Sequence, residues 1–212
     1  MARQFPRRVG LWMSGIHHEP MPTNPEPKLA APGAGLPLPE LMIGRMFFRL
    51  KRLISNRAGI AARFEAERAI IRGMVDQCPT ALRGKRILIA RCRGLEDSSR
   101  NWSVWMTLDH LRITNNAFSH VIRSLVSGQV PTKPASTADV KPDPTVTAAV
   151  DAAYEQSCAA LMETIADCPD LNTKLKYSHP WFGPMNAAAW HVLSAGHLAI
   201  HREQIRRILT GL

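Results

Sequence analysis

The chain has 212 residues, 45% of them hydrophobic and 21% charged, which is typical of one folded domain with a full core. No run approaches the roughly 18 apolar residues that a membrane span needs, so we expect no membrane partner. The formal net charge of +10 makes nucleic-acid binding one candidate function. However, the basic residues have little aromatic interleaving and no nucleic-acid-binding motif, so a solvated basic arm is the preferred interpretation.

The cysteines and the N-terminus indicate a cellular compartment. The four cysteines show no CxxC spacing and are predicted to be reduced thiols: Cys78, Cys92, Cys158 and Cys168. The apolar stretch Val9–Ile16 is short and is followed by a proline cluster in place of a small-residue cleavage site, so no secretory signal is expected. These features predict a cytoplasmic protein.

Residues 1–37 are predicted to be a disordered, Pro-rich basic extension. Their prolines interrupt any periodic pattern, so the segment cannot bury enough apolar surface to offset the entropy of ordering. Residues 1–60 hold nine Lys and Arg against three Asp and Glu, so much of the excess positive charge lies near this end.

An additional helix is predicted between residues 39 and 55. It carries an apolar row that needs a partner surface: Leu41, Met46, Phe47, Leu50 and Ile54. We expect this row to pack across the bundle or, as a second option, to form a homodimer. The next helical pattern runs over residues 61–75, and the sequence leaves open whether Gly59 separates the two helices.

Residues 78–101 form a long connection with one short β-like run at residues 86–90. No partner strand is evident, so no sheet is predicted. Long ordered connections in compact domains tend to border functional sites.

Two further helices are predicted on either side of a surface crossover. In the first, Ser103 is the N-cap, Gly128 ends the helix and His110 lies on the inner face, near Met106, Ile113 or Thr114, Ala117 and Val121. The Pro/Ser/Thr/Lys-rich residues 131–144 form the crossover. The second helix covers residues 146–168, with Tyr154 and Glu155 expected at its surface or edge.

The last helix carries two histidines at helical spacing. Asn186 is its predicted N-cap after the turn-rich residues 179–184, and Gly211 ends it. His197 and His201 are four residues apart, so they lie one turn apart on one face and can reach the same ion. On pattern alone the alternative stays open that they are two polar residues at the solvent edge of a helix.

These elements predict an all-α fold, a four-helix bundle with a long crossover between helices 2 and 3, plus the N-terminal extension. The bundle domain would span residues 38–212, including the additional N-terminal helix. Metal sites in bundles are built from inward side chains on facing helices, and His110 opposite His197 and His201 fits that design.

The order of the motifs resembles the DinB-like superfamily over roughly residues 60–210. The motifs are Trp102-Ser103, Asp109-His110-Leu111, His179-Pro180, Phe182-Gly183 and His197-x-x-x-His201-x-x-Gln204. The resemblance implies a four-helix bundle that binds a divalent metal, zinc, nickel or similar, through His110, His197 and His201. The connection between Arg83 and Arg100 is longer than in the simpler members of the superfamily.

Three neutral imidazoles would leave an open coordination position, as in catalytic zinc sites. The resemblance implies a metal-dependent hydrolase, or a transferase or isomerase that uses a low-molecular-weight thiol such as bacillithiol, mycothiol or glutathione, acting on a small molecule. A non-catalytic metal- or ligand-binding bundle and, less favoured, a basic nucleic-acid-associated protein are the alternatives.

No general base is identified by the sequence. Asp109 would point about 100° away from His110 around the helix axis. Gln204 is the expected hydrogen-bond partner of a ligand, and Trp190 is expected to line the pocket or the core. His120 and His191 are predicted to be structural.

Overall fold

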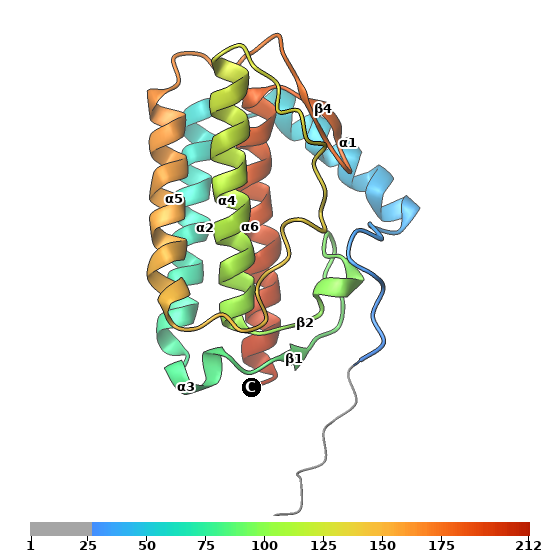
Figure 1. Cartoon of the computed structure of the whole chain (residues 1–212), viewed down its shortest axis with the longest axis vertical. Coiled ribbons are helices and arrows are strands. Elements are labelled where there is room, and N and C mark those ends of the chain that lie inside the picture. The colour runs from blue at the N-terminus through green and yellow to red at the C-terminus, as the bar shows by residue number, and fades with distance from the viewer. Residues whose placement is uncertain (1–26) are drawn as a thin grey trace, which may run out of the picture.

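The computed structural model describes residues 27–212. Four long helices form a bundle: α2 (Arg57–Gln77), α4 (Val104–Val126), α5 (Ala149–Asp167) and α6 (Ala187–Thr210). Helix α4 packs against α5 and α6, and α6 packs against α2. The segment between α4 and α5 returns along the length of the bundle, so these two helices run in the same direction (Figure 1). The all-α bundle with a crossover between its second and third helices confirms the predicted fold class.

Side-chain caps fix where three of these helices begin. Ser103 Oγ accepts a hydrogen bond from the Met106 amide at 3.1 Å, and Asn186 Oδ1 accepts one from the Ala189 amide at 3.1 Å, as the sequence predicts. Asn56 Oδ1 caps α2 through the Gly59 amide at 2.8 Å. Each cap satisfies an amide of the first turn that has no partner within the helix. The first two helices of the chain are therefore separated before Asn56, and Gly59 lies inside the first turn of α2.

The bundle core consists of apolar side chains at helical spacing. Phe64 and Ile71 of α2, Leu111 of α4, Leu161 of α5 and Ile205 of α6 are all fully buried. Burying each such side chain contributes roughly 1.5–3 kcal/mol of hydrophobic free energy. The core is continuous along the bundle, so it supports the helices that carry the histidines.

Tyr154 belongs to this core, and its predicted surface position is wrong. It is 2% exposed. It lies one and two turns before Cys158 and Leu161, so it shares their buried face of α5. Glu155 is half-buried and pairs with Arg68 at 2.7 Å.

Two short antiparallel pairs interrupt the helical architecture, together with a one-turn helix α3 (Thr80–Arg83) and a 3-10 turn η1 (Asp97–Ser99). Strand β1 (Ile87–Leu88) pairs with β2 (Asn101–Trp102), and β3 (Tyr177–His179) pairs with β4 (Gly183–Met185). The prediction of no partner for residues 86–90 is wrong, because the partner is the short segment just before α4. A two-residue strand is too short to show the alternation that predicts a sheet.

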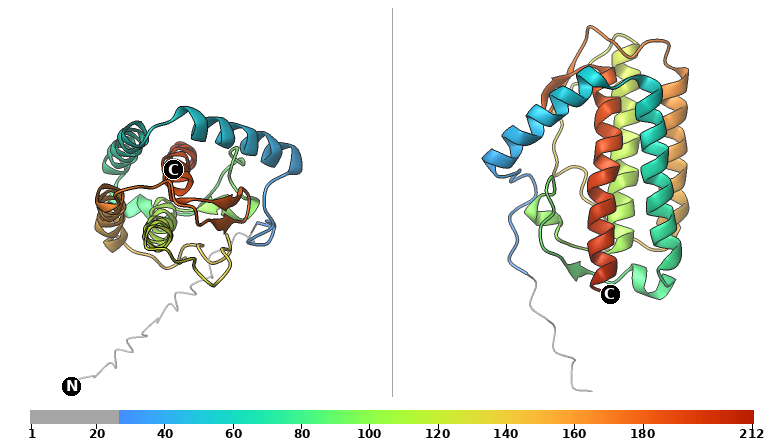
Figure 2. Two further views of the ribbon diagram at one scale, coloured as in Figure 1. Left: turned by 90° about the horizontal axis from the view of Figure 1, so that it is seen from above. Right: turned by 180° about the vertical axis from the view of Figure 1, so that it is seen from behind.

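Helix α1 (Leu38–Ile54) crosses the bundle diagonally on the side of α6 (Figure 2, right). Three contacts hold it there. Phe48 stacks on Phe182 with ring centroids 4.6 Å apart, and Arg45 Nε donates to the Trp181 carbonyl at 2.6 Å. Glu40 accepts hydrogen bonds from Arg91 and from the Gly94 amide.

The predicted apolar row of α1 is only partly used by this packing. Leu41 is half-buried, whereas Met46, Phe47, Leu50 and Ile54 are exposed. The expectation that the whole row would pack on the bundle is therefore wrong. The contact of α1 is made mainly by the opposite side of the helix, around Gly44 and Phe48.

The N-terminal extension enters the described structure at residue 27. The Ala30 amide donates to Asp97 Oδ2 at 2.8 Å, and the Gly33 amide donates to Glu96 Oε2 at 3.4 Å. The predicted disorder of the extension falls largely on residues 1–26, which lie outside the described residues.

The remaining compositional expectations concern the cysteines and the membrane. All four cysteines are free thiols, as predicted, and the structure also shows that all four are buried. Within residues 27–212, none of the helices combines the length and the apolar character that crossing a membrane requires.

Candidate metal centre

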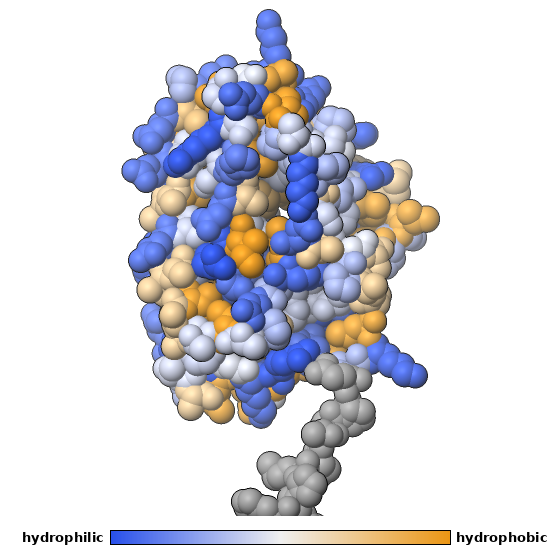
Figure 3. Space-filling model, viewed as in Figure 1, coloured by the Kyte–Doolittle hydropathy of each residue, from blue (hydrophilic) through white to orange (hydrophobic). Residues whose placement is uncertain are grey.

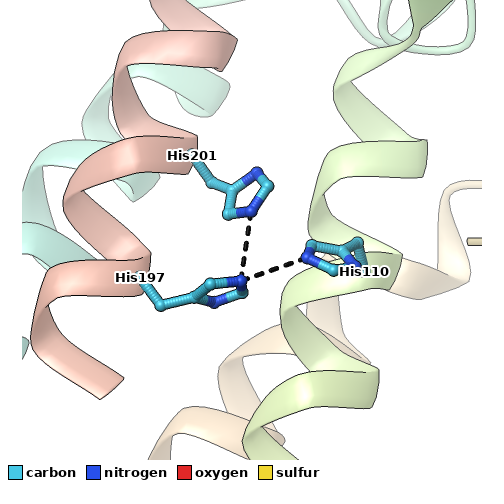
Figure 4. Close-up of side chains that lie close together, drawn as sticks. All are labelled: His110, His197 and His201. Atoms are coloured by element: carbon cyan, nitrogen blue, oxygen red, sulfur yellow. Dashed lines mark hydrogen bonds between the residues drawn. The ribbon is translucent and has the colours of Figure 1, made fainter. Parts of the chain in front are cut away.

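Three imidazoles converge between α4 and α6 (Figure 4). His197 Nε2 lies 3.2 Å from His110 Nε2 and 3.2 Å from His201 Nε2. The three ligand atoms all lie within 4.8 Å of one another. Tetrahedral bonds of about 2.1 Å would place ligand atoms about 3.4 Å apart. The spacing of the three nitrogens therefore fits one divalent ion.

Helix geometry brings these side chains together. His197 and His201 lie one turn apart on α6, and His110 faces them from the packed helix α4. His110 and His201 are 6% and 4% exposed, and all three histidines border a cavity. The convergence and the i, i+4 arrangement were predicted from the sequence, and the geometry confirms them.

Hydrogen bonds at Nδ1 determine which ring nitrogen of His110 and of His201 is free to bind a metal ion. His110 Nδ1 lies 2.6 Å from the Val140 carbonyl oxygen, which can only accept, so Nδ1 carries the proton. His201 Nδ1 lies 2.6 Å from Gln204 Oε1, and Gln204 Nε2 donates to the Ser99 carbonyl at 2.8 Å, which fixes the orientation of the amide. Both histidines therefore direct an Nε2 lone pair towards the common centre.

His197 differs from its two neighbours. Its Nδ1 is buried and has no hydrogen-bond partner within residues 27–212, so the expectation that every imidazole would find one is wrong here. The Phe118 ring lies against it edge-on, with centroids 5.7 Å apart, and offers no acceptor. The expected hydrogen bond of Gln204 to one of the three histidines is present at His201.

Burial keeps the three imidazoles neutral. Desolvation lowers the pKa of His110 to about 4, although the Val140 carbonyl opposes the shift. Desolvation also lowers the pKa of His197 and of His201 well below the ordinary value, and the neighbouring imidazoles add to it. Only a neutral imidazole can bind a metal, so at pH 7 the three histidines are in the protonation state that metal binding requires.

An aromatic and charged layer packs behind the imidazoles. The Trp102 ring stacks on His201, with centroids 6.2 Å apart and planes 9° apart, and tilts against His110 at 5.2 Å. Lys141 Nζ lies 5.5 Å from the Trp102 ring centroid and pairs with buried Glu96 at 2.6 Å. This layer fixes the position of two of the three rings.

Asp109 points away from the centre, as expected. Its Oδ1 pairs with Arg112 at 2.8 Å, and its Oδ2 accepts the Asp143 amide at 3.0 Å. Asp109 thereby holds the crossover whose Val140 carbonyl binds His110. No sequence pattern identifies Val140 or Ser99, because their contribution comes from backbone carbonyls.

A cavity of about 760 Å³ opens beside the imidazoles. Segments from α1, the crossover and the β3–β4 hairpin enclose it. Its walls are rich in aromatic side chains: Phe47, Phe48, Phe118, Trp181, Phe182 and Trp190. The predicted position of Trp190 at the pocket is confirmed, although it is also 3% exposed and part of the core.

His179 is a fourth histidine of this cavity. Its Nδ1 accepts a hydrogen bond from the Trp181 amide at 3.0 Å, so its Nε2 carries the proton. Burial lowers its pKa to about 4, so it stays a neutral donor at pH 7. From the sequence, His179 was placed in the turn and in the His179-Pro180 motif but was given no role in the pocket, because a contact within a turn leaves no periodic signal.

The other two histidines stay apart from the cluster. His120 is exposed at the rim of the cavity. His191 is 2% exposed on the buried side of α6. Neither joins the group of described residues that could hold a metal ion, which is His110, His197 and His201.

Comparison with known proteins agrees with this architecture. Residues 60–205 match the family model of the DinB superfamily. The crystal structure of TT2238, a four-helix bundle protein, is similar with a TM-score of 0.52 and 20% sequence identity, over 71% of this chain and 98% of that one. At that identity the likeness shows the fold alone. No curated protein sequence matches the chain.

Proposed function

The chain belongs to the DinB superfamily, and from that membership and the imidazole geometry we propose that it is a metal-dependent enzyme with His110, His197 and His201 as ligands. The observation that carries the proposal is the pair of hydrogen bonds that keep the ring proton of His110 and of His201 on Nδ1. These bonds leave both Nε2 lone pairs facing His197. A merely structural cluster of histidines has no need of such matched tautomers.

A divalent ion held there, zinc, nickel or similar, supplies an electrophilic centre with an open position. The cluster of described residues contains three ligands and no fourth His, Cys, Asp or Glu. Because all three histidines line the cavity, an ion held by them would be accessible to a small molecule bound there.

The residues around the open position support chemistry on a small molecule. The aromatic walls make much of the cavity lining apolar, and electrostatic interactions are stronger in apolar surroundings than in water. The Nε2–H of His179 is a donor in the same cavity, suited to a developing negative charge on a substrate oxygen or sulfur. Hydrolysis and transfer or isomerisation with a low-molecular-weight thiol both fit this arrangement.

Turnover in the presence of metal tests the proposal. Protein loaded with zinc or nickel is assayed for hydrolysis of a chromogenic aryl ester and for conjugation of glutathione to an aryl halide. The wild type and the control His120→Ala are expected to show activity that a chelator removes, and His197→Ala is expected to lose it. Rates that are equal with and without metal would contradict the proposal. Metal binding without turnover in either assay would favour a binding protein.

A further inference from the structure

The outward face of α1 is apolar along its whole length. Its exposed apolar side chains are between 49% and 83% accessible: Leu38, Met42, Ile43, Met46, Phe47, Leu50, Leu53 and Ile54. Figure 3, in the view of Figure 1, shows hydrophobic residues at the edge of the molecule where α1 lies. Contiguous apolar surface of this kind marks an interaction site.

Helical geometry makes these side chains one continuous surface. At about 100° per residue they cover roughly half the circumference of the helix, opposite the side that contacts the bundle. The contact side is already satisfied by Phe48, Gly44 and Leu41, which are half-buried. The exposed side is therefore the part of α1 that still needs a partner.

The acidic and basic residues of α1 also differ in their exposure. Its one acidic residue, Glu40, points inwards to Arg91 and the Gly94 amide. Arg49, Lys51 and Arg52 are exposed and form no ion pair within residues 27–212. The exposed apolar face is thus bordered by cations alone, so its partner is expected to be anionic.

We propose that α1 docks on an anionic lipid surface. An apolar helix face bordered by arginine and lysine is the pattern of helices that lie in the membrane interface, where each cation near anionic headgroups adds about 1 kcal/mol. Long basic side chains can extend from an inserted helix to the headgroups. A second copy of this chain fits less well, because pairing two α1 faces brings like charges together with no exposed acidic residue on either helix.

This docking needs no membrane-spanning segment. It departs from the sequence-based expectation of no membrane partner, which rested on the absence of such a segment. It is independent of the metal centre. It also has a structural consequence, since Phe47 and Phe48 of the same helix line the cavity. Lipid contact would then lie directly outside one cavity wall.

Vesicle flotation of the full-length protein tests the proposal. The probes are vesicles of phosphatidylcholine alone and of phosphatidylcholine mixed with phosphatidylglycerol. Binding is expected only to the anionic vesicles and to weaken as salt is added. Leu50→Ser with Leu53→Ser, and separately Arg49→Gln with Arg52→Gln, are each expected to lower binding at least about tenfold.

Matched controls replace exposed residues elsewhere on the molecule. Ile70→Ser with Leu88→Ser removes two exposed apolar side chains, and Arg72→Gln with Lys176→Gln removes two exposed cations. Both controls are expected to bind like the wild type.

Sedimentation of the same proteins distinguishes the two partners considered for the apolar face of α1, a lipid surface and a second copy of the chain. A wild type that stays monomeric and binds anionic vesicles supports the proposal. A dimer that becomes monomeric in the Leu50→Ser, Leu53→Ser protein would overturn it in favour of a second copy. Equal binding to both kinds of vesicle, or an equal loss in the controls, would also overturn it.

Discussion

At the scale of single residues, the centre depends on groups that are not themselves ligands. Gln204 links His201 to the Ser99 carbonyl, and Asp109 holds the segment whose Val140 carbonyl binds His110. Each hydrogen bond fixes one ring and one tautomer, so the lone pairs are aligned before an ion arrives.

Replacing Gln204 tests this alignment. In Gln204→Leu, the Nδ1–H of His201 and the Ser99 carbonyl lose their partner, and metal affinity is expected to fall about 10- to 100-fold while the helix content is retained. Competition with a chelating dye measures the affinity. Gln156→Leu, an exposed glutamine on α5, is the control. Equal affinity in the two variants would show that the Gln204 bond does not matter.

Buried His191 predicts a specific dependence of stability on pH. Burial, with a contribution from Arg57, lowers its pKa to about 4, whereas an unfolded histidine titrates near 6.5. Between these values the unfolded state binds more protons, so the stability that neutral His191 supports is present above about pH 6.5 and is lost as the pH falls towards 4.

His191→Leu is therefore expected to flatten the fall in unfolding free energy between pH 6.5 and 4, by up to about 1.4 kcal/mol per pH unit. Urea unfolding at a series of pH values measures the slope. His120→Leu, at an exposed position, is the control and should keep the wild-type slope. An unchanged slope in His191→Leu would contradict the assignment.

Sequence reasoning at this scale succeeded where a side chain has a positional signature. The caps Ser103 and Asn186 and the histidine pair on α6 belong to that class. Val140 and Ser99 were missed because they act through backbone carbonyls. His179 was noted in a motif, but its place in the cavity was missed because no spacing rule encodes a contact within a turn.

At the scale of elements, α1 is held by few contacts. Glu40 joins its first turn to Arg91 and the Gly94 amide, and the Arg91 hydrogen bond holds the pKa of Glu40 below its usual value. Helix α1 has no buried residue, so these polar contacts account for much of its attachment.

Glu40→Gln is expected to make α1 detach from the bundle more often. The loss of a charged hydrogen bond, about 1.5–3 kcal/mol, should raise hydrogen exchange of the amides in residues 38–54 by about tenfold or more. Peptide-resolved exchange measures this, and Glu163→Gln, at an exposed position on α5, is the control. Exchange that stays at the wild-type level would mean that Phe48 and Arg45 suffice to hold the helix.

Helices were predicted well because long apolar periodicity is robust to a few exceptions. The β1–β2 pair was missed because two residues per strand carry no pattern, and its register is set by the Arg100 carbonyl, which accepts the Ile89 amide at 3.0 Å. The orientation of α1 was also missed, because apolar residues lie on both of its sides and periodicity does not say which side meets the bundle.

At the scale of the whole molecule, the bundle and its crossover follow from the number and order of the helices. The cavity does not follow from them. It is enclosed by α1, residues 131–141 and the β3–β4 hairpin, whose positions depend on individual contacts such as Arg45 to the Trp181 carbonyl.

The Pro-rich extension predicts a proteolytic pattern. Limited proteolysis is expected to cut within residues 1–37 first and to leave a folded remainder, because that composition gives no apolar face. The amides of Ala30 and Gly33 are hydrogen-bonded to Asp97 and Glu96, so cleavage should be fastest before residue 30. Mass spectrometry of the fragments locates the cuts. An N-terminus that resists the protease would contradict this prediction.

The central claim is that one divalent ion binds His110, His197 and His201, and metal analysis of purified proteins tests it most directly. The wild type, His120→Ala and His191→Ala are expected to hold one ion per chain. His197→Ala and His201→Ala are expected to lose it while keeping the helical circular dichroism of the wild type, because the apolar faces supply most of the stability. Stoichiometric metal retained in His197→Ala and His201→Ala would contradict the site and, with it, the proposed enzyme.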